Sequence, residues 1–345
     1  MRARTRFTAL LVAVATASAL TACGQSDDGP KENVPTVTPA TAAESPMSDA
    51  TPAGTVVVAL PAKAIVVGHG AGAKTAILSN DGTRVQLFAA PGAMDAPAPI
   101  TVTVPALGAI AAVGNGFVGA GTDGLVRIDA NGGVTEQKAE LGGVLSLAVT
   151  DDQRVLVGTD RGHVLVLDSA GTVKRDIGGF VRVDSITVAP ASAGDRAGQV
   201  VVLDRAQSAV TPIDIDTGEL KAALRAGDGA TVSTVDQYGR VLVSGTRNDE
   251  VYAFYGQPIV MRLRAPVPAS PYAIAYDGRS DTLWVASTAS DVITGYDVSS
   301  GEALERHRIT SVPQVTAMTV TDAGDLLAVS GRDGALQVVF PNDVR

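Results

Sequence analysis

The chain has 345 residues, of which 46% are hydrophobic and only 4% aromatic, so we expect one or two sizeable domains with an aliphatic core. Its formal net charge of −9 argues against nucleic-acid binding, because phosphate recognition requires clustered Lys and Arg. The same acidic balance argues against a broad electrostatic hold on anionic lipid.

The first 22 residues have the pattern of a secretory signal peptide. Three arginines, at positions 2, 4 and 6, precede an apolar run over residues 7–20. As a helix this run is shorter than the ~30 Å hydrocarbon core of a bilayer, which favours a cleaved leader over a transmembrane anchor. The run ends in Leu20-Thr21-Ala22-Cys23, which resembles the lipobox of bacterial lipoproteins. That resemblance implies that Cys23, the only cysteine, carries a lipid and holds the protein on the extracytoplasmic side of the cell membrane.

Residues 23–54 are expected to form the lipidated cysteine and a disordered linker. The segment is rich in Pro, Ser, Thr and Ala and has almost no large apolar side chains. Such a composition buries too little surface to offset the loss of chain entropy on ordering. The predicted folded domain then covers residues 55–345.

After residue 54 the sequence begins to repeat as groups of short apolar strands separated by turns. Units start at about residues 62, 106, 143, 182, 229, 270 and 312, which matches the ~40–45-residue period of four-stranded propeller blades. Each unit has three apolar strands followed by a more polar fourth strand. Seven starts predict an all-β, seven-bladed β-propeller. Six or eight blades, or two β-sandwiches, are the alternatives.

The last unit ends after its third strand, at residue 340, whereas residues 55–60 form a strand left over before the first unit. We expect the leading strand to complete the last blade, because this arrangement closes the ring and covers an exposed sheet edge.

Several motifs that suggest chemistry are better interpreted as structural. Asp-Gly pairs at residues 81, 123, 277 and 333 favour turns over carboxylate ligands, since both residue types tolerate positive φ. The three histidines, His69, His163 and His307, fall at unrelated positions of different units and predict ordinary surface or turn residues. Residues 68–75 are Gly-rich, but the phosphate-loop spacing is wrong and a strand follows instead of a helix. Trp284 is the only tryptophan, which argues against a quinone cofactor and favours a core position.

One set of residues suggests a binding face. The turns after the second strands of propeller blades lie on one face, and here these turns carry both Asp and Arg. A mixed ring of this kind could bind a peptide, a glycan or a partner protein, although solvated turns have the same composition. The candidate residues are Asp123, Asp160, Arg161, Arg205, Arg247, Asp249, Asp291, Arg332 and Asp333.

The chain resembles the LppL-type lipoproteins of actinobacteria, with a propeller head of the quinoprotein, YVTN or WD40 kind. The resemblance rests on the lipobox and on residues 201–205, 223–227, 238–243 and 288–297. It implies an envelope lipoprotein without an assigned activity, in which only Cys23 transfers as a functional position. We therefore expect a binding or scaffolding module for an envelope protein or glycan, with no cofactor and no catalytic or metal site. The alternative is a metal-dependent envelope hydrolase or lactonase with its site at the propeller tunnel.

Overall fold

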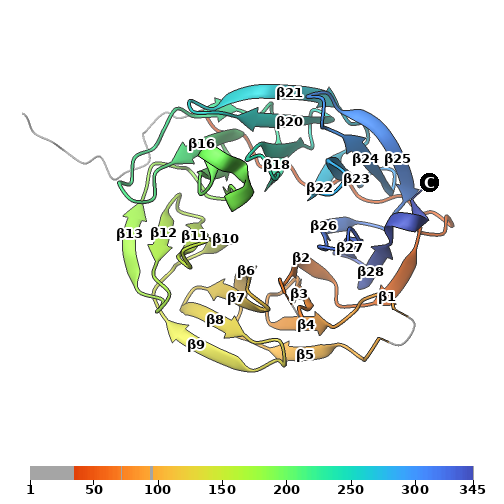
Figure 1. Ribbon diagram of the computed structural model, residues 1–345, viewed down its shortest axis with the longest axis horizontal. Helices are drawn as coiled ribbons and strands as arrows, with labels where there is room; N and C mark the ends of the chain where they lie inside the picture. Colours follow the sequence, from red (N-terminus) through yellow and green to blue (C-terminus); the bar gives the residue numbers. More distant parts are fainter. Residues whose placement is uncertain (1–34, 71, 94–95, 345) are drawn as a thin grey trace, which may run out of the picture.

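The computed structural model of the protein describes residues 35–70, 72–93 and 96–344. Within them, seven four-stranded antiparallel sheets radiate around a central axis (Figure 1). The prediction of an all-β, seven-bladed propeller is confirmed. The predicted leader and Cys23 lie outside the described residues. Nowhere in the described ranges is a helix long and apolar enough to cross a membrane.

Blades 1 to 7 are numbered in chain order, and the strands of each run from the axis outward. Blade 1 contains β2 (Ala62–Val67), β3 (Thr75–Ser79), β4 (Arg84–Phe88) and β5 (Ile100–Thr103). Blade 2 contains β6 (Leu107–Val113), β7 (Gly116–Gly121), β8 (Gly124–Ile128) and β9 (Val134–Lys138). Blade 3 contains β10 (Val144–Val149), β11 (Val155–Thr159), β12 (Val164–Leu167) and β13 (Val173–Ile177). Blade 4 contains β14 (Ser185–Val188), β15 (Val200–Asp204), β16 (Ala209–Ile213) and β17 (Leu224–Arg225), with the 3-10 turn η1 (Ala191–Arg196) between its first two strands.

The remaining blades follow the same order. Blade 5 contains β18 (Ala230–Val235), β19 (Val241–Gly245), β20 (Glu250–Tyr255) and β21 (Val260–Pro266). Blade 6 contains β22 (Pro271–Asp277), β23 (Thr282–Ser287), β24 (Val292–Asp297) and β25 (Leu304–Thr310). Blade 7 contains β26 (Val315–Val320), β27 (Leu326–Ser330), β28 (Ala335–Val339) and β1 (Thr55–Val58), and the 3-10 turn η2 (Pro341–Asp343) follows β28.

Burial explains why the strands of one blade differ in composition. Every residue of β11, β15, β19, β23 and β27 is buried, because a second strand is covered on both faces by the neighbouring blades. These strands consist mainly of Val, Leu and Ala, with few charged residues. The outermost strands β9 and β13 are largely exposed and carry the charged residues. The core is therefore a series of apolar layers between adjacent blades rather than one central cluster.

The leading strand closes the ring as predicted. β1 pairs antiparallel with β28, with Thr55 opposite Val338 and Val58 opposite Ala335. Gly54 precedes it with φ of 71°, and a Cβ there would lie 2.2 Å from the carbonyl oxygen of Val338. The first and last described strands thus share one sheet.

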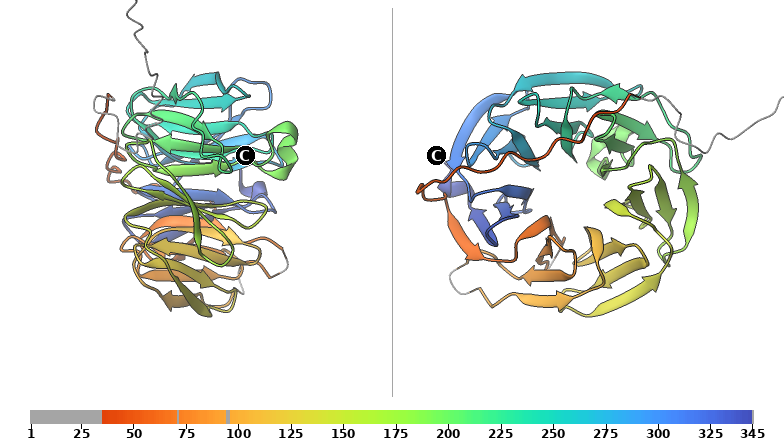
Figure 2. Two further views of the ribbon diagram at one scale, coloured as in Figure 1. Left: turned by 90° about the vertical axis from the view of Figure 1, so that its left-hand side faces the viewer. Right: turned by 180° about the vertical axis from the view of Figure 1, so that it is seen from behind.

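Antiparallel order sends alternate turns to opposite faces of the ring. Turns between the second and third strands lie on the same face as the connections from one blade to the next. We call this the connection face; the other turns form the opposite face. Figure 1 views the opposite face, and the right-hand view of Figure 2 shows the connection face from behind.

The structure differs from the predicted linker over residues 35–54. This part has no helix or strand, but it runs extended across the connection face past blades 4 to 7 (Figure 2) and hydrogen-bonds to them. Composition alone did not indicate this, because main-chain hydrogen bonds to the propeller compensate for the small apolar area that the segment can bury. Residues 23–34 lie outside the described residues.

Candidate binding face

All nine residues suggested by the sequence lie in turns of the connection face, but the structure does not group them into one site. Asp123 is in blade 2, and Asp160 and Arg161 are in blade 3. These three side chains are exposed. The others lie in blades 4 to 7, where residues 35–54, which we call the N-terminal segment, cross the face. They are Arg205, Arg247, Asp249, Asp291, Arg332 and Asp333.

Blades 4 and 5 hold residues 37–40 of the segment through the main-chain atoms of these residues. The Val37 N–H donates to the carbonyl of Ala206 over 2.7 Å. The Arg247 guanidinium donates to the carbonyl of Thr38 over 2.7 Å, and Arg205 donates to the carbonyl of Ala40. Two of the predicted arginines therefore bind a peptide backbone.

Ala40 fits where the propeller backbone leaves room for a methyl group. Its side chain is buried, and a Cβ at Gly229 would lie 3.3 Å from the Ala40 Cβ. Gly229 has φ of 115°, a conformation that L side chains rarely adopt. The glycine thus creates a shallow site that accepts a small side chain.

Residues 43–45 are held by blades 6 and 7. The Gln314 side chain donates to the carbonyl of Ala43 over 3.0 Å and accepts the N–H of Ser45 over 3.0 Å. The Ala43 N–H donates to Ser270 Oγ over 3.3 Å. One amide side chain therefore pairs with the segment's main chain as a neighbouring strand would.

Ser45 is recognised through its side chain. It is 5% exposed, and its hydroxyl donates to Asp291 Oδ1 over 2.5 Å while accepting the Gln314 N–H over 2.6 Å. The Thr288 carbonyl lies 3.2 Å from the same hydroxyl. Asp291 is itself 5% exposed, so this predicted residue forms the floor of a buried polar site.

Left-handed backbone conformations are concentrated on this part of the face. Among the described residues, eight non-glycine residues have positive φ, and six of them lie in turns or connections of blades 4 to 7 on the connection face. These six are Ser208, Asp249, Ala269, Ser270, Asp291 and Gln314. Such conformations persist only where surrounding structure enforces them, and they occur preferentially at functional sites.

In blades 4, 5 and 6 the residue before the third strand has a polar side chain in this left-handed conformation. Ser208 accepts the N–H groups of Gly229 and Ala230, each over 3.0 Å. Asp249 accepts the Ser270 N–H over 2.8 Å, and Asp291 binds Ser45. The corresponding residue of blade 7 is glycine, Gly334, with φ of 66°.

A second carboxylate supports the arginine of blade 4. Asp184 Oδ2 accepts the Arg205 N–H over 2.9 Å, and Asp184 also pairs with Arg182 over 2.7 Å. Burial raises the pKa of Asp184, and the hydrogen bond from Arg205 and the charge of Arg182 oppose that rise. The connection before β14 is thus fixed against the turn that carries Arg205.

Two residues that contact the segment, Ser270 and Gln314, were not among the predicted ones. They lie in blade-to-blade connections, which end on the same face as the turns between second and third strands. Arg332 and Asp333, in contrast, pair with each other over 2.9 Å and are exposed.

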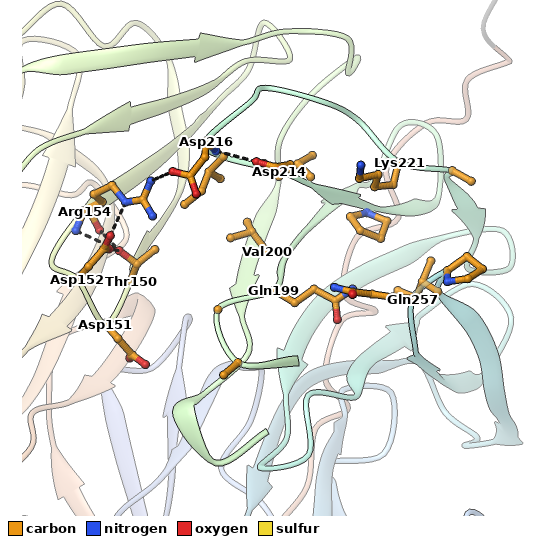
Figure 3. A pocket seen from close by; sticks show the side chains of 18 residues that line it. Thr150, Asp151, Asp152, Arg154, Gln199, Val200, Asp214, Asp216, Lys221 and Gln257 are labelled. Carbon is orange, nitrogen blue, oxygen red and sulfur yellow. Dashed lines mark hydrogen bonds and ion pairs between the residues drawn. The ribbon is translucent and has the colours of Figure 1, made fainter. Parts of the chain in front are cut away.

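A large pocket lies on the opposite face, and Figure 3 shows the residues that line it. It has a volume of about 900 Å³ and is formed by turns of blades 3, 4 and 5. Its apolar wall includes Val200, Ile213 and Ile259. None of the nine predicted residues lines it.

At one side of this pocket a single arginine pairs with two carboxylates. Arg154 pairs with Asp216 over 2.5 Å and with Asp152 over 2.8 Å (Figure 3). A hydrogen bond from Thr150, together with Arg154, lowers the pKa of Asp152. Asp214 accepts the N–H groups of Asp216 and Thr217, each over 2.9 Å, and so shapes the turn.

The histidines do not converge. His69 lies 3.9 Å from Asp322, and His163 lies 2.7 Å from Asp176. His307 was predicted as a surface or turn residue, but it is half-buried on β25 and stacks on Trp284 with 5.6 Å between ring centroids. Across residues 35–70, 72–93 and 96–344, no group of three or more His, Cys, Asp or Glu side chains could hold a metal.

Other motifs occupy the places that the sequence indicated. The described part of the Gly-rich stretch, residues 68–70 and 72–74, lies between β2 and β3, and Thr75 begins β3. Trp284 is 6% exposed and belongs to the core between blades 6 and 7. Asp81 shows what the Asp-Gly pairs do: hydrogen bonds from Ser79 and Thr83 lower its pKa to about 2 and fix the turn.

No family model and no curated protein matches the chain. Solved structures with the same fold include the streptogramin B lyase structure, with a TM-score of 0.62 at 12% identity over 82% of this chain and 97% of the other. BBS1N in complex with ARL6DN has a TM-score of 0.64 at 16% identity over 83% and 95%. The WD40 β-propeller domain of Doa1 has a TM-score of 0.64 at 13% identity over 83% and 96%. At these identities the similarity establishes the propeller fold alone.

Proposed function

We propose that the chain is a cell-envelope lipoprotein, similar to the LppL-type proteins of actinobacteria. Its lipid on Cys23 would hold it to the outer face of the cell membrane, where the propeller would act as a binding or scaffolding module. A protein or a glycan of the envelope is the proposed partner.

The anchor is supported by the order of features at the N-terminus. A basic start, a short apolar run and Leu20-Thr21-Ala22-Cys23 follow one another at the spacing of a lipoprotein leader. Two acyl chains give stable attachment at ~0.8 kcal/mol per buried methylene, so an acidic head needs no electrostatic contact with lipid.

The binding role is supported above all by the contact between the connection face and residues 37–45. This face binds an extended chain through Arg205, Arg247 and Gln314, whose side chains reach main-chain atoms. A propeller face of this kind is suited to recognise another polypeptide, which makes a protein partner the better supported choice.

The anchor is tested by Cys23→Ala in cells that process lipoproteins. We expect the variant to accumulate as an uncleaved precursor that incorporates no labelled palmitate, whereas the parent is labelled and pellets with membranes. Labelling and processing of the variant equal to the parent would disprove the anchor. Crosslinking of the anchored protein in intact cells tests the binding role, which fails if no envelope protein or glycan is captured specifically.

A further inference from the structure

The contact on the connection face has the features of a receptor site for an extended peptide, occupied by the chain's own residues 37–45. Main-chain atoms of the segment make most of the bonds: the N–H groups of residues 37, 43 and 45 and the carbonyls of residues 38, 40 and 43. Recognition of this kind tolerates many sequences. Specificity then comes from the positions whose side chains are buried.

Only two side chains of the segment are buried, those of Ala40 and Ser45. The site at Gly229 accepts a small residue, and the site at Asp291 and Gln314 accepts a hydroxyl five positions later. The intervening Glu44 is exposed. The site therefore selects an extended segment with a small residue followed, five positions on, by a side chain that both donates and accepts.

Residues 37–45 do not pair with every polar atom of the site. With the segment in place, Asp291 Oδ2 and Arg205 Nε are buried without a hydrogen-bond partner among the described residues. A buried unpaired polar group costs about 1–3 kcal/mol. A ligand that supplies a donor to Asp291 Oδ2 would bind more tightly than residues 37–45.

Residues 37–45 compete with a separate peptide for the site because they are tethered close to it, and not because they bind it with optimal contacts. They are joined to the propeller through residues 46–54, and a short connection of this kind gives an effective concentration on the order of mM. A separate peptide of equal affinity could not displace them at micromolar concentrations. A better fitting or membrane-concentrated partner could.

We propose that the surface of blades 4 to 7 that contacts residues 37–45 binds an extended segment of a partner protein, and that residues 37–45 are a displaceable intrachain occupant. This inference deepens the proposed binding function and rests on it. The partner segment would carry Ala or Gly at the position of Ala40 and a hydroxyl or amide side chain at the position of Ser45.

The experiment uses the full chain with Ser45→Asp. A second carboxylate beside buried Asp291 should expel the segment while leaving every propeller residue that contacts it unchanged. The probe is a fluorescent peptide with the sequence of residues 35–48. We expect S45D to bind it one to one and at least 10-fold more tightly than the parent, whose own segment competes.

Two controls identify the site. The double variant S45D with Gln314→Ala should bind the peptide at least 10-fold more weakly than S45D, and a probe that carries Ser45→Asp should not bind. Equal binding by parent and S45D, or no binding by a folded S45D at millimolar probe, would overturn the proposal. Neither result would affect lipidation or crosslinking, so failure here is distinguishable from failure of the proposed function.

Hydrogen exchange on the unchanged chain gives a test that does not depend on a variant. We expect the N–H groups of Val37, Ala43 and Ser45 to exchange at least 100-fold faster than those of buried β23, because the segment opens locally. Excess probe that carries Ser45→Asn should accelerate that exchange further. Exchange of the three groups only with global unfolding would make the segment a permanent part of the fold and refute the proposal.

Discussion

The two halves of the connection face, formed by blades 1 to 3 and by blades 4 to 7, are built differently. In blades 1 and 3, glycines relieve the turns after the second strands, at Gly82 and Gly162, and residues 35–54, the described part of the N-terminal segment, make no hydrogen bond to these blades. In blades 4 to 6, polar side chains occupy left-handed positions at Ser208, Asp249 and Asp291. Each of them holds either a neighbouring connection or the segment itself.

This difference shows that a repeated scaffold can be specialised in a few turns without a change in its blades. A glycine relieves a left-handed turn at no steric cost but presents no side chain. A serine or aspartate at that position is strained, yet it offers a hydrogen-bonding group at the rim of the ring. The strained half is the half that binds a chain.

The largest difference between the two halves is expected in the free energy of unfolding, when one connecting glycine in each half is replaced by alanine. In Gly229→Ala the new Cβ would lie 2.6 Å from the Arg247 Cβ, at φ of 115°. Strain and overpacking together should lower the free energy of unfolding by about 3 kcal/mol.

The matched control is Gly142→Ala, in the connection between blades 2 and 3. Its φ is 73° and no atom lies within 4 Å of the new Cβ, so about 1 kcal/mol is expected. Denaturant titration followed by Trp284 fluorescence measures both. Equal losses would show that the two halves are packed alike.

A smaller effect should separate strain from hydrogen bonding at Ser208. Ser208→Ala keeps a side chain at φ of 49° but leaves the buried N–H groups of Gly229 and Ala230 without their acceptor. We expect a loss of about 2 kcal/mol in the free energy of unfolding.

Ser208→Gly removes the same hydrogen bonds and relieves the backbone. It should therefore be less destabilised than the alanine variant, by up to about 1 kcal/mol. If alanine proved the more stable of the two, strain at this position would be negligible and the comparison of halves would lose its basis.

The smallest effect should be acid sensitivity, which is expected in turns of the opposite face and should be shared by the blades of both halves of the ring. Hydrogen bonds from the N–H groups of Gly133 and Asn131 lower the pKa of Asp129 in blade 2, and those of Thr217 and Asp216 lower the pKa of Asp214 in blade 4. A carboxyl whose folded pKa is below its unfolded value stabilises the fold fully above the unfolded pKa, near 4. That stabilisation is lost as the pH falls through the folded pKa.

Unfolding at pH 7, 4 and 3 measures this dependence. Below about pH 4 the free energy of unfolding should decrease, and Asp129→Asn and Asp214→Asn should each flatten the decrease by a similar amount. A flattening confined to one of the two variants would show that acid acts on one half only.

Most of the architecture could be predicted from the sequence because the determinants of each blade are local. Buried second strands require apolar residues on both faces, outer strands remain polar, and this alternation recurs in every blade, so the unit starts predicted near 62, 143 and 270 lie close to the first residues of β2, β10 and β22. The unpaired strand at residues 55–58 likewise indicated closure with β28.

The site was harder to predict from the sequence, because its contacts join residues far apart in the chain. Nothing in the composition of residues 35–45 shows that Ser45 pairs with Gln314, 269 residues later. One signal was present: the third strands of blades 4, 5 and 6 follow Ser208, Asp249 and Asp291 where blade 7 has Gly334. A polar residue in place of a turn glycine indicates a turn whose side chain also makes hydrogen bonds to neighbouring parts of the chain.

The pairing of β1 with β28 also sets an order of events during synthesis. The polypeptide is delivered from its N-terminus, so residues 55–58 emerge almost three hundred positions before their partner at residues 335–338. Until then Val56 and Val58 lie on a strand without a neighbour. The ring can be sealed only when the whole polypeptide is on one side of any membrane it crosses, and a chain released before residue 335 would keep an open edge prone to aggregation.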